Sequence, residues 1–287
     1  MKAKYPIYIV SKGRWDSRLT SKALESMNVP YHIIVEPQEY EEYANVIDKE
    51  KVLMLPQKYH DEYDPCTDEK HKSNGPGAAR NFAWQHSIDN GYTSHWVMDD
   101  NITGFGRVNR NKYHRVKSGA IFRACEDFVD RYENVAISGL QYYMFFPLKE
   151  KRPAFIQNTR IYSCLLIRNH LKYRWRGRYN EDTDLSLRVL KDGLCTVEFM
   201  AFLQEKLMTQ TLKGGNTEEF YAGEGTMKKS AMLQKMHPEV ARVIWRYGRW
   251  HHFVDYNSFK KNKLVLKKDI KLTDEKNEFG MVVKKVK

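Results

Sequence analysis

Two adjacent carboxylates, Asp99 and Asp100, follow an apolar segment, residues 94–98, that is typical of a buried strand. Like charges side by side repel, so solvent or a cation must compensate them. Mg²⁺ and Mn²⁺ prefer oxygen ligands, and at phosphate sites one or two protein carboxylates bind the ion together with the substrate. A cation shared with a diphosphate would neutralise this leaving group as its bond to carbon breaks. The alternative is a solvated acidic turn after a strand.

A glycine-rich turn lies one helix before this strand. The segment GPGAARN, residues 75–81, has two glycines and a proline and carries Arg80. Glycines allow a ligand to approach the backbone closely, and the amino end of a helix attracts phosphate. The segment is therefore either a phosphate-binding turn or an ordinary helix start.

A second acidic group lies in RGRYNEDTDLSLR, residues 176–188, where Glu181, Asp182 and Asp184 begin a helical pattern. Acidic residues are favoured in first helical turns in any case, so helix stabilisation alone could explain them. Three arginines precede them: Arg174, Arg176 and Arg178. Such a cluster can also hold a general base against charged partners.

A histidine pair, His251 and His252, lies in GRWHHF at residues 248–253. Histidine is a common metal ligand, but adjacent histidines in regular structure point in different directions, so at most one is expected to bind a metal. A surface pair is the alternative. The pair matters for the site only if the C-terminal segment folds back over Asp99 and Asp100.

The composition limits the classes of function. The chain has 287 residues, a hydrophobic fraction of 41% and a net charge of +12. This fraction can build a packed core, and the basic excess suits a polyanionic partner, although a merely basic surface is the alternative. The four cysteines are far apart, which argues against a zinc site or a disulfide framework and favours free thiols in a reducing cytoplasm. No signal peptide and no run of about 20 apolar residues is present.

Strand-like and helix-like segments alternate through the first half of the chain. Strands are expected at residues 5–10, 31–35, 51–55 and 94–98, and helices at residues 17–27 and 38–46; in residues 73–91 a loop leads into a further helix that ends at Asn90 and Gly91. The alternation predicts an α/β fold, with a mostly parallel, Rossmann-like sheet flanked by helices. Because such sheets bind ligands at the carboxyl ends of their strands, Gly13, Glu36 and the aspartate pair could face one crevice.

The second half continues this pattern and then changes character. Helices are expected at residues 120–132 and from residue 180 onward, and strands at residues 135–138, 160–167 and 196–202. Gly214 and Gly215 mark a boundary between a catalytic domain, residues 1–213, and a C-terminal helical, basic and aromatic extension, residues 214–287, expected to pack on it.

Taken in order, IVSKGR, a strand ending in Glu36, GPGAARN, VMDD and a later NED resemble the GT-A-fold glycosyltransferases, metal-dependent enzymes that use nucleotide-sugar donors. Within that group the chain is similar to the phage TET-associated DNA glycosyltransferases over about residues 5–205. The members of that family are thought to add sugars to hydroxymethylated pyrimidines in phage DNA. The usual DxD signature has an acid where this chain has Asn101, so we interpret Met98-Asp99-Asp100 as an xDD variant.

The resemblance implies a donor site. Ser11, Gly13 and Arg14 would line the nucleotide pocket of a UDP-sugar, Glu36 would meet the uridine, and Arg80 would approach the diphosphate.

The resemblance also implies a metal site and a base. Asp99 would lie by the ribose, and Asp100 would bind Mn²⁺ or Mg²⁺, with His252 favoured over His251 as a further ligand. Asp182 would take the proton of the acceptor hydroxyl, and Glu181 would lie beside it.

The sequence thus predicts a phage enzyme of the host cytoplasm that transfers sugar from a UDP-sugar to 5-hydroxymethylcytosine, or another hydroxymethylpyrimidine, in DNA with inversion. Four tail aromatics would form a nucleic-acid surface or pack in the core: Trp245, Tyr247, Trp250 and Phe253. Three alternatives remain open: a glycosyltransferase for a protein, lipid or polysaccharide acceptor, a metal-dependent nuclease, and a non-catalytic nucleic-acid-binding module. The nuclease would gather two ions on four acids: Asp99, Asp100, Glu181 and Asp182.

Overall fold

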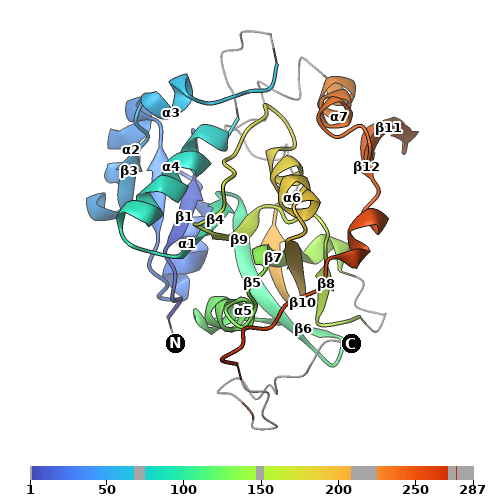
Figure 1. Ribbon diagram of the computed structural model, residues 1–287. Helices are drawn as coiled ribbons and strands as arrows, with labels where there is room; N and C mark the ends of the chain where they lie inside the picture. Colours follow the sequence, from blue (N-terminus) through green and yellow to red (C-terminus); the bar gives the residue numbers. More distant parts are fainter. Residues whose placement is uncertain (1, 68–74, 147–151, 208–224, 271–275, 277–287) are drawn as a thin grey trace.

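A mixed β-sheet forms the centre of the computed structural model, which describes residues 2–67, 75–146, 152–207, 225–270 and 276 (Figure 1). Within these residues the sheet has ten strands in the order β3-β2-β1-β4-β9-β7-β10-β5-β6, with β8 paired to β10. The strands are β1 Ile7–Val10, β2 His32–Val35, β3 Val52–Met54, β4 Ser94–Asp99, β5 Ile102–Asn109, β6 Lys112–Arg115, β7 Val135–Tyr142, β8 Phe155–Gln157, β9 Cys164–Arg168 and β10 Cys195–Lys206.

Helices cover both faces of this sheet (Figure 1). They are α1 Leu19–Ser26, α2 Tyr40–Ala44, α3 Lys58–Asp61, α4 Gly77–Asp89, α5 Ala120–Val129, α6 Glu181–Lys191 and α7 Gly225–Met236, with short 3₁₀ turns η1 Pro37–Glu39, η2 Lys49–Lys51, η3 Tyr143–Phe145 and η5 Asn257–Lys261. A second, two-stranded sheet consists of β11 Ala241–Arg246 and β12 Arg249–Val254.

Side-chain alternation along the strands creates two apolar layers. In β4, Trp96 and Met98 face the layer that includes α1 and α5, and Val97 faces the layer that includes α4 and α6. Because successive residues of a strand point to opposite faces, a fully apolar strand requires cover on both sides, and here it has that cover. The predicted α/β fold with flanking helices is therefore confirmed.

The carboxyl ends of the strands that matter for function lie at one edge of the sheet. The strands β1, β2, β3 and β4 are mutually parallel. The strand β9 runs antiparallel to both β4 and β7, and β7 is parallel to β10, so β10 has the same direction as β4. The carboxyl ends of β1, β4 and β10 therefore lie at the same edge of the sheet, where sheets of this class bind their ligands.

Several elements differ from the sequence-based expectation. The β5–β6 hairpin, β8 and the β11–β12 hairpin are absent from the prediction, and the strand predicted from residue 160 begins at Cys164. The predicted boundary at Gly214 lies outside the described residues. The four cysteines are free thiols, as expected.

The C-terminal residues that are described fold back onto the sheet and α6 (Figure 1). Asn158 donates both amide hydrogens, to the carbonyl oxygens of Phe259 and Asn262 at 2.8 Å each. Asn262 in turn donates to the carbonyls of Leu190 at 2.8 Å and Leu194 at 2.9 Å. These buried amides attach the chain that follows the β11–β12 hairpin, so the hairpin has a fixed root.

Candidate active site

The loop after β1 contacts Asp100. Val10 is in register with Asp99 of β4, so the residue that follows each strand end meets the other. Ser11 donates from Oγ to Asp100 Oδ2 at 2.8 Å, and Arg14 forms an ion pair with Asp100 Oδ1. The hydroxyl of Tyr43 bonds Ser11 Oγ at 2.6 Å and accepts the Arg14 N–H at 3.1 Å, which fixes the loop. Burial raises the pKa of Asp100 despite the opposing effect of Arg14.

Two other predicted donor-site residues lie at the same sheet edge but do not contact the aspartate pair. Gly13 has a φ of 65°, a conformation that favours glycine, and its N–H donates to Glu39 Oε2 at 2.7 Å. Glu36 directly follows β2, and its Oε2 lies 3.0 Å from His60 Nε2. The Glu36–His60 pair therefore lies at the carboxyl end of β2, beside the end of β1.

Asp99 lies between two cations. Its Oδ1 is 2.8 Å from Arg80 and its Oδ2 is 2.8 Å from Lys206 Nζ, which also donates to Ser163 Oγ at 2.7 Å. Burial acts to raise the pKa of Asp99, but Lys206 and Arg80 hold it well below its usual range. Lys206 ends β10 and pairs in register with Ile102, two residues after Asp100, which explains why this distant lysine reaches the site.

Arg80 connects the two acidic groups that the sequence shows separately. One guanidinium nitrogen binds Asp99 and the other lies 2.9 Å from Glu181 Oε1, while the guanidinium carbon lies 4.6 Å from the Trp175 ring centroid. Its side chain is only 4% exposed, so this arginine is held rigidly. Burial raises the pKa of Glu181, against the lowering effect of Arg80. The contacts make Glu181 a partner of Arg80 rather than an independent acid.

One glycine of the predicted phosphate turn, Gly77, has a packing role. The amino end of α4 lies against Tyr63, and a Cβ at Gly77 would lie 1.9 Å from the Tyr63 hydroxyl oxygen. That hydroxyl donates to the carbonyl of Gly177 at 2.8 Å, which anchors the segment before α6. Binding of phosphate by this turn stays a prediction.

Asp182 is differently placed from its neighbours. It lies in the first turn of α6, half-buried, and its Oδ1 accepts the N–H of Thr183 at 2.7 Å. Among the described residues it forms no ion pair, so its carboxylate has capacity to accept a proton. This arrangement suits the predicted general base.

The C-terminal hairpin joins the site at Asp182. Asp182 acts electrostatically on His252 and on Tyr256, and both also respond to Arg160. Burial, reinforced by Arg160, lowers the pKa of His252 to about 4, so this imidazole is neutral at pH 7. His252 Nε2 and Tyr256 Oη are buried and accept or donate no hydrogen bond within the described part of the chain. His251 instead accepts from Arg249 Nε at 3.2 Å.

Around Arg160 lie further groups that sequence reasoning missed. Tyr162 and Tyr256 both interact electrostatically with Arg160, Asp182 and Glu198. Burial raises the pKa of Glu198 to about 7, although Arg160 opposes the shift. These buried groups lie near Arg160, and their charges act on one another and on Asp182.

The predicted metal site can be compared with this geometry. All four carboxylate oxygens of the aspartate pair already have a cation or a hydroxyl as partner. His252 interacts with Asp182, and within the described ranges no group of three or more acidic, histidine or cysteine side chains is arranged to hold a metal. As they stand, these residues do not fit Mn²⁺ or Mg²⁺ at Asp100. A metal cofactor stays a prediction.

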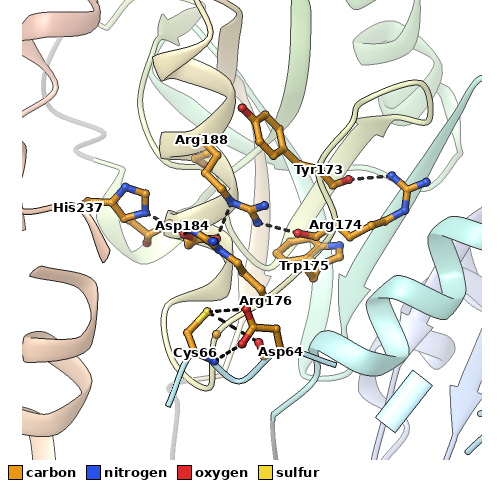
Figure 2. Close-up of polar contacts among 12 residues, drawn as sticks. Asp64, Cys66, Tyr173, Arg174, Trp175, Arg176, Asp184, Arg188 and His237 are labelled. Atoms are coloured by element: carbon orange, nitrogen blue, oxygen red, sulfur yellow. Dashed lines mark hydrogen bonds and ion pairs between the residues drawn. The ribbon is translucent and has the colours of Figure 1, made fainter. Parts of the chain in front are cut away.

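Asp184 belongs to a structural cluster (Figure 2). It is fully buried and contacts Arg188 at 2.7 Å, Arg176 at 3.2 Å and His237 at 2.8 Å. Figure 2 shows these three side chains converging on it, with His237 coming from the segment after α7. Although burial acts in the opposite direction, His237 and Arg188 lower the pKa of Asp184. This acid joins α6 to the C-terminal segment.

The sequence model of the TET-associated glycosyltransferases matches residues 5–215. The chain belongs to the TET-associated glycosyltransferase family. The predicted resemblance is thereby confirmed, and the enzyme is a glycosyltransferase, a class that transfers a sugar from a donor to an acceptor. The matched region includes the donor-side contacts and Asp182, whereas the β11–β12 hairpin lies beyond it. A search of the curated proteins finds no match to the sequence. None of the described helices is both long and apolar enough to cross a membrane.

Proposed function

We propose that this glycosyltransferase moves a sugar from a UDP-sugar to the hydroxymethyl group of 5-hydroxymethylcytosine in phage DNA, with inversion, in the cytoplasm of the bacterial host. Family membership supports the transfer of a sugar. The observation that supports DNA as acceptor is an exposed hairpin of aromatic and arginine side chains whose root interacts with Asp182.

The hairpin β11–β12 presents unusual side chains to solvent. Trp245 is 60% exposed and Tyr247 is 79% exposed, and the Trp245 ring packs edge-to-face on Trp250 at 5.0 Å. Arginines flank these rings: Arg242, Arg246 and Arg249. Aromatic faces that stack on bases, together with cations that bind phosphates, are the usual composition of a nucleic-acid surface.

The turn of this hairpin holds an aromatic residue outward. Tyr247 and Gly248 have φ values of 53° and 71°, which match the two-residue type I′ turn favoured by tight hairpins. Left-handed φ is unfavourable for tyrosine, and the asparagine usual at this position would adopt it more easily. A strained aromatic at an exposed tip is an observation that favours a function in binding.

The length of the hairpin relates the tip to the site. His252 lies five residues after Tyr247, so the tip is about 17 Å from His252 at a rise of about 3.3 Å per residue, and the charge of Asp182 acts on His252. A duplex held at the tip could present an extruded nucleotide to Asp182.

The reaction requires little covalent chemistry of the protein. The hydroxymethyl oxygen of the acceptor attacks the anomeric carbon from the face opposite the diphosphate. The carbon–oxygen bond to the diphosphate breaks, and its electron pair stays on the phosphate oxygen. Asp182 takes the acceptor proton, an assistance that is typically worth about 10²–10⁴-fold in rate. The loop after β1 and Arg80 would hold the donor in position.

The alternatives are less well supported. A two-ion nuclease needs carboxylates facing metal ions, but Asp99 and Glu181 face Arg80 instead. A non-catalytic module disagrees with membership of a glycosyltransferase family. A glycosyltransferase with another acceptor would have the same donor site, but this alternative does not explain why the hairpin exposes aromatic and arginine side chains.

Mass spectrometry of digested DNA tests the proposal. The protein would be incubated with a panel of UDP-sugars and DNA that contains 5-hydroxymethylcytosine, with cytosine DNA as the matched control. We expect a hexose-sized or N-acetylhexosamine-sized gain on the modified nucleoside alone. UDP-sugar hydrolysis without this gain would contradict the DNA acceptor and retain the donor assignment.

A further inference from the structure

We propose that Lys206, together with Arg80 and Arg14, neutralises the departing diphosphate, so that donor binding and sugar transfer by this chain need no divalent cation. The inference rests on the proposed nucleotide-sugar donor. It departs from the metal dependence that the resemblance implies.

The first argument is the occupancy of the carboxylates. Asp99 accepts from Arg80 and from Lys206 at 2.8 Å each, and Asp100 accepts from Ser11 at 2.8 Å and pairs with Arg14. An ion at either carboxylate would have to share an oxygen that already accepts from one of these donors, three of which carry a positive charge. Like charges a few ångströms apart in a partly buried site repel strongly, so a divalent ion beside Arg14 is disfavoured.

The second argument is that the cations are built into the fold. The side chains of Arg14, Arg80 and Lys206 are 11%, 4% and 12% exposed. They come from the loop after β1, from α4 and from the end of β10, which are three separate parts of the chain. Fixed charges in a partly buried site stabilise developing negative charge without reorganisation during the reaction.

The third argument is the position of Lys206. It ends β10, whose carboxyl end points in the same direction as those of β1 and β4, where a sheet of this class binds its ligand. An ammonium group has three N–H donors, and within the described residues two of them have acceptors, on Asp99 and Ser163. The third can donate to a phosphate oxygen.

The charges of Arg14, Arg80 and Lys206 can stabilise the negative charge that develops on the diphosphate during the chemical step. When the anomeric carbon–oxygen bond breaks, its electron pair adds one negative charge to the diphosphate. Lysine and arginine side chains that also balance Asp99, Asp100 and Glu181 can donate hydrogen bonds to the diphosphate oxygens and so supply part of the stabilisation that a metal ion supplies in related chemistry. Lys206 is thus assigned a direct contact with the leaving group.

Calorimetric titration of UDP into chelator-treated protein tests the inference, because it requires no acceptor. We expect the affinity for UDP in EDTA to change by less than about twofold when Mn²⁺ replaces the chelator. Lys206→Met should weaken UDP binding by about 10- to 100-fold, as loss of a charge-assisted hydrogen bond does. Lys172→Met is the matched control, since Lys172 is an exposed lysine paired with Asp192 on the surface and should leave binding unchanged.

A gain of about tenfold or more in UDP affinity when Mn²⁺ is added to the unmodified protein would overturn the inference. Unchanged UDP affinity in a folded Lys206→Met protein would overturn it as well. If that variant does not fold, as thermal unfolding would reveal, the UDP affinity of the unmodified protein with and without chelator still tests the inference. Binding that persists in EDTA without any transfer to DNA would count against the proposed acceptor only. No UDP binding under either condition would overturn both proposals.

Discussion

Asp182 and Asp184 lie two residues apart on α6, yet their environments are opposite. Asp184 is fully buried and contacts three basic side chains, whereas Asp182 is half-buried and forms no ion pair among the described residues. Because α6 turns about 200° over two residues, Asp184 faces His237 and two arginines, whereas Asp182 points away from them and its charge acts on His252 and Tyr256. The comparison shows that position on the helix, rather than residue type, separates a structural acid from a candidate base.

The largest effect is expected for Asp182→Asn. The amide cannot accept the acceptor proton, so the rate of sugar transfer should fall by about 10²–10⁴-fold. The melting temperature should change little, because the side chain is half-buried and unpaired. Transfer rates at saturating UDP-sugar, compared with UDP binding by calorimetry, check the prediction. A rate within a factor of a few of the unmodified enzyme would remove Asp182 as the base.

Asp184→Asn should give the converse result. It leaves the buried cations of the cluster without their counter-charge, which typically costs about 3–5 kcal/mol and lowers the melting temperature by roughly 6–15 °C in a protein of this size. The folded fraction should retain its transfer rate. Thermal unfolding and transfer below the melting temperature measure the two quantities.

The contribution of Asp184 to the stability of the fold should depend on pH. Because the folded-state pKa of Asp184 is lowered, its contribution to stability is present above its unfolded pKa of about 4 and is lost as the pH falls through the folded value. Asp184→Asn should therefore flatten the acid limb of the stability curve below about pH 4. An unchanged acid limb would show that this cluster does not stabilise the fold.

The sequence alone predicts those strands and helices whose hydrophobic pattern is local. The runs YPIYIV, YHIIV and SHWVM are apolar enough to predict β1, β2 and β4. Because the residues that follow neighbouring parallel strands lie at the same edge of the sheet, these strands also place Ser11 near Asp100. Lys206 could have been found by the same rule, had the predicted strand been extended from residue 202 to its actual end.

Other parts depend on long-range pairing that no local pattern reveals. The strand β5 contains two glycines and pairs with β10 about a hundred residues away. The hairpin β11–β12 turns at Tyr247-Gly248, without the asparagine that usually signals such a turn. The cluster around Arg160 forms only when this hairpin folds back, so its members could not be assembled from the sequence.

A further prediction concerns the tip of the β11–β12 hairpin, which should bind the acceptor DNA and not the UDP-sugar donor. Tyr247→Ala should weaken binding to DNA by about 5- to 150-fold, the range expected when one base–aromatic stack of about 1–3 kcal/mol is lost. Affinity for UDP should be unchanged. Fluorescence anisotropy with labelled DNA at fixed salt measures the first quantity, and calorimetry measures the second.

Tyr92→Ala provides the matched control for the tip. Tyr92 is 44% exposed in the turn between α4 and β4, so it is an exposed tyrosine as well, although less exposed than Tyr247, and it lacks the flanking arginines. Equal losses of DNA affinity in the two variants would show that the hairpin has no special role in DNA binding.

The smallest effect is expected at Glu198, on the acceptor side of the comparison. This carboxyl is 7% exposed, and burial raises its pKa to about 7, against Arg160. Between its unfolded pKa of about 4.3 and pH 7 the folded state therefore binds a proton that the unfolded state has released, so the protein loses stability as the pH rises through this window. Glu198→Gln has no such proton to lose. Relative to the unmodified protein, its stability should be higher at pH 6.5 than at pH 5 by roughly 1–2 kcal/mol, measured by denaturant unfolding at the two values. If both proteins show the same change between pH 5 and pH 6.5, Glu198 is ionised in the folded state throughout, and Arg160 rather than burial determines its charge.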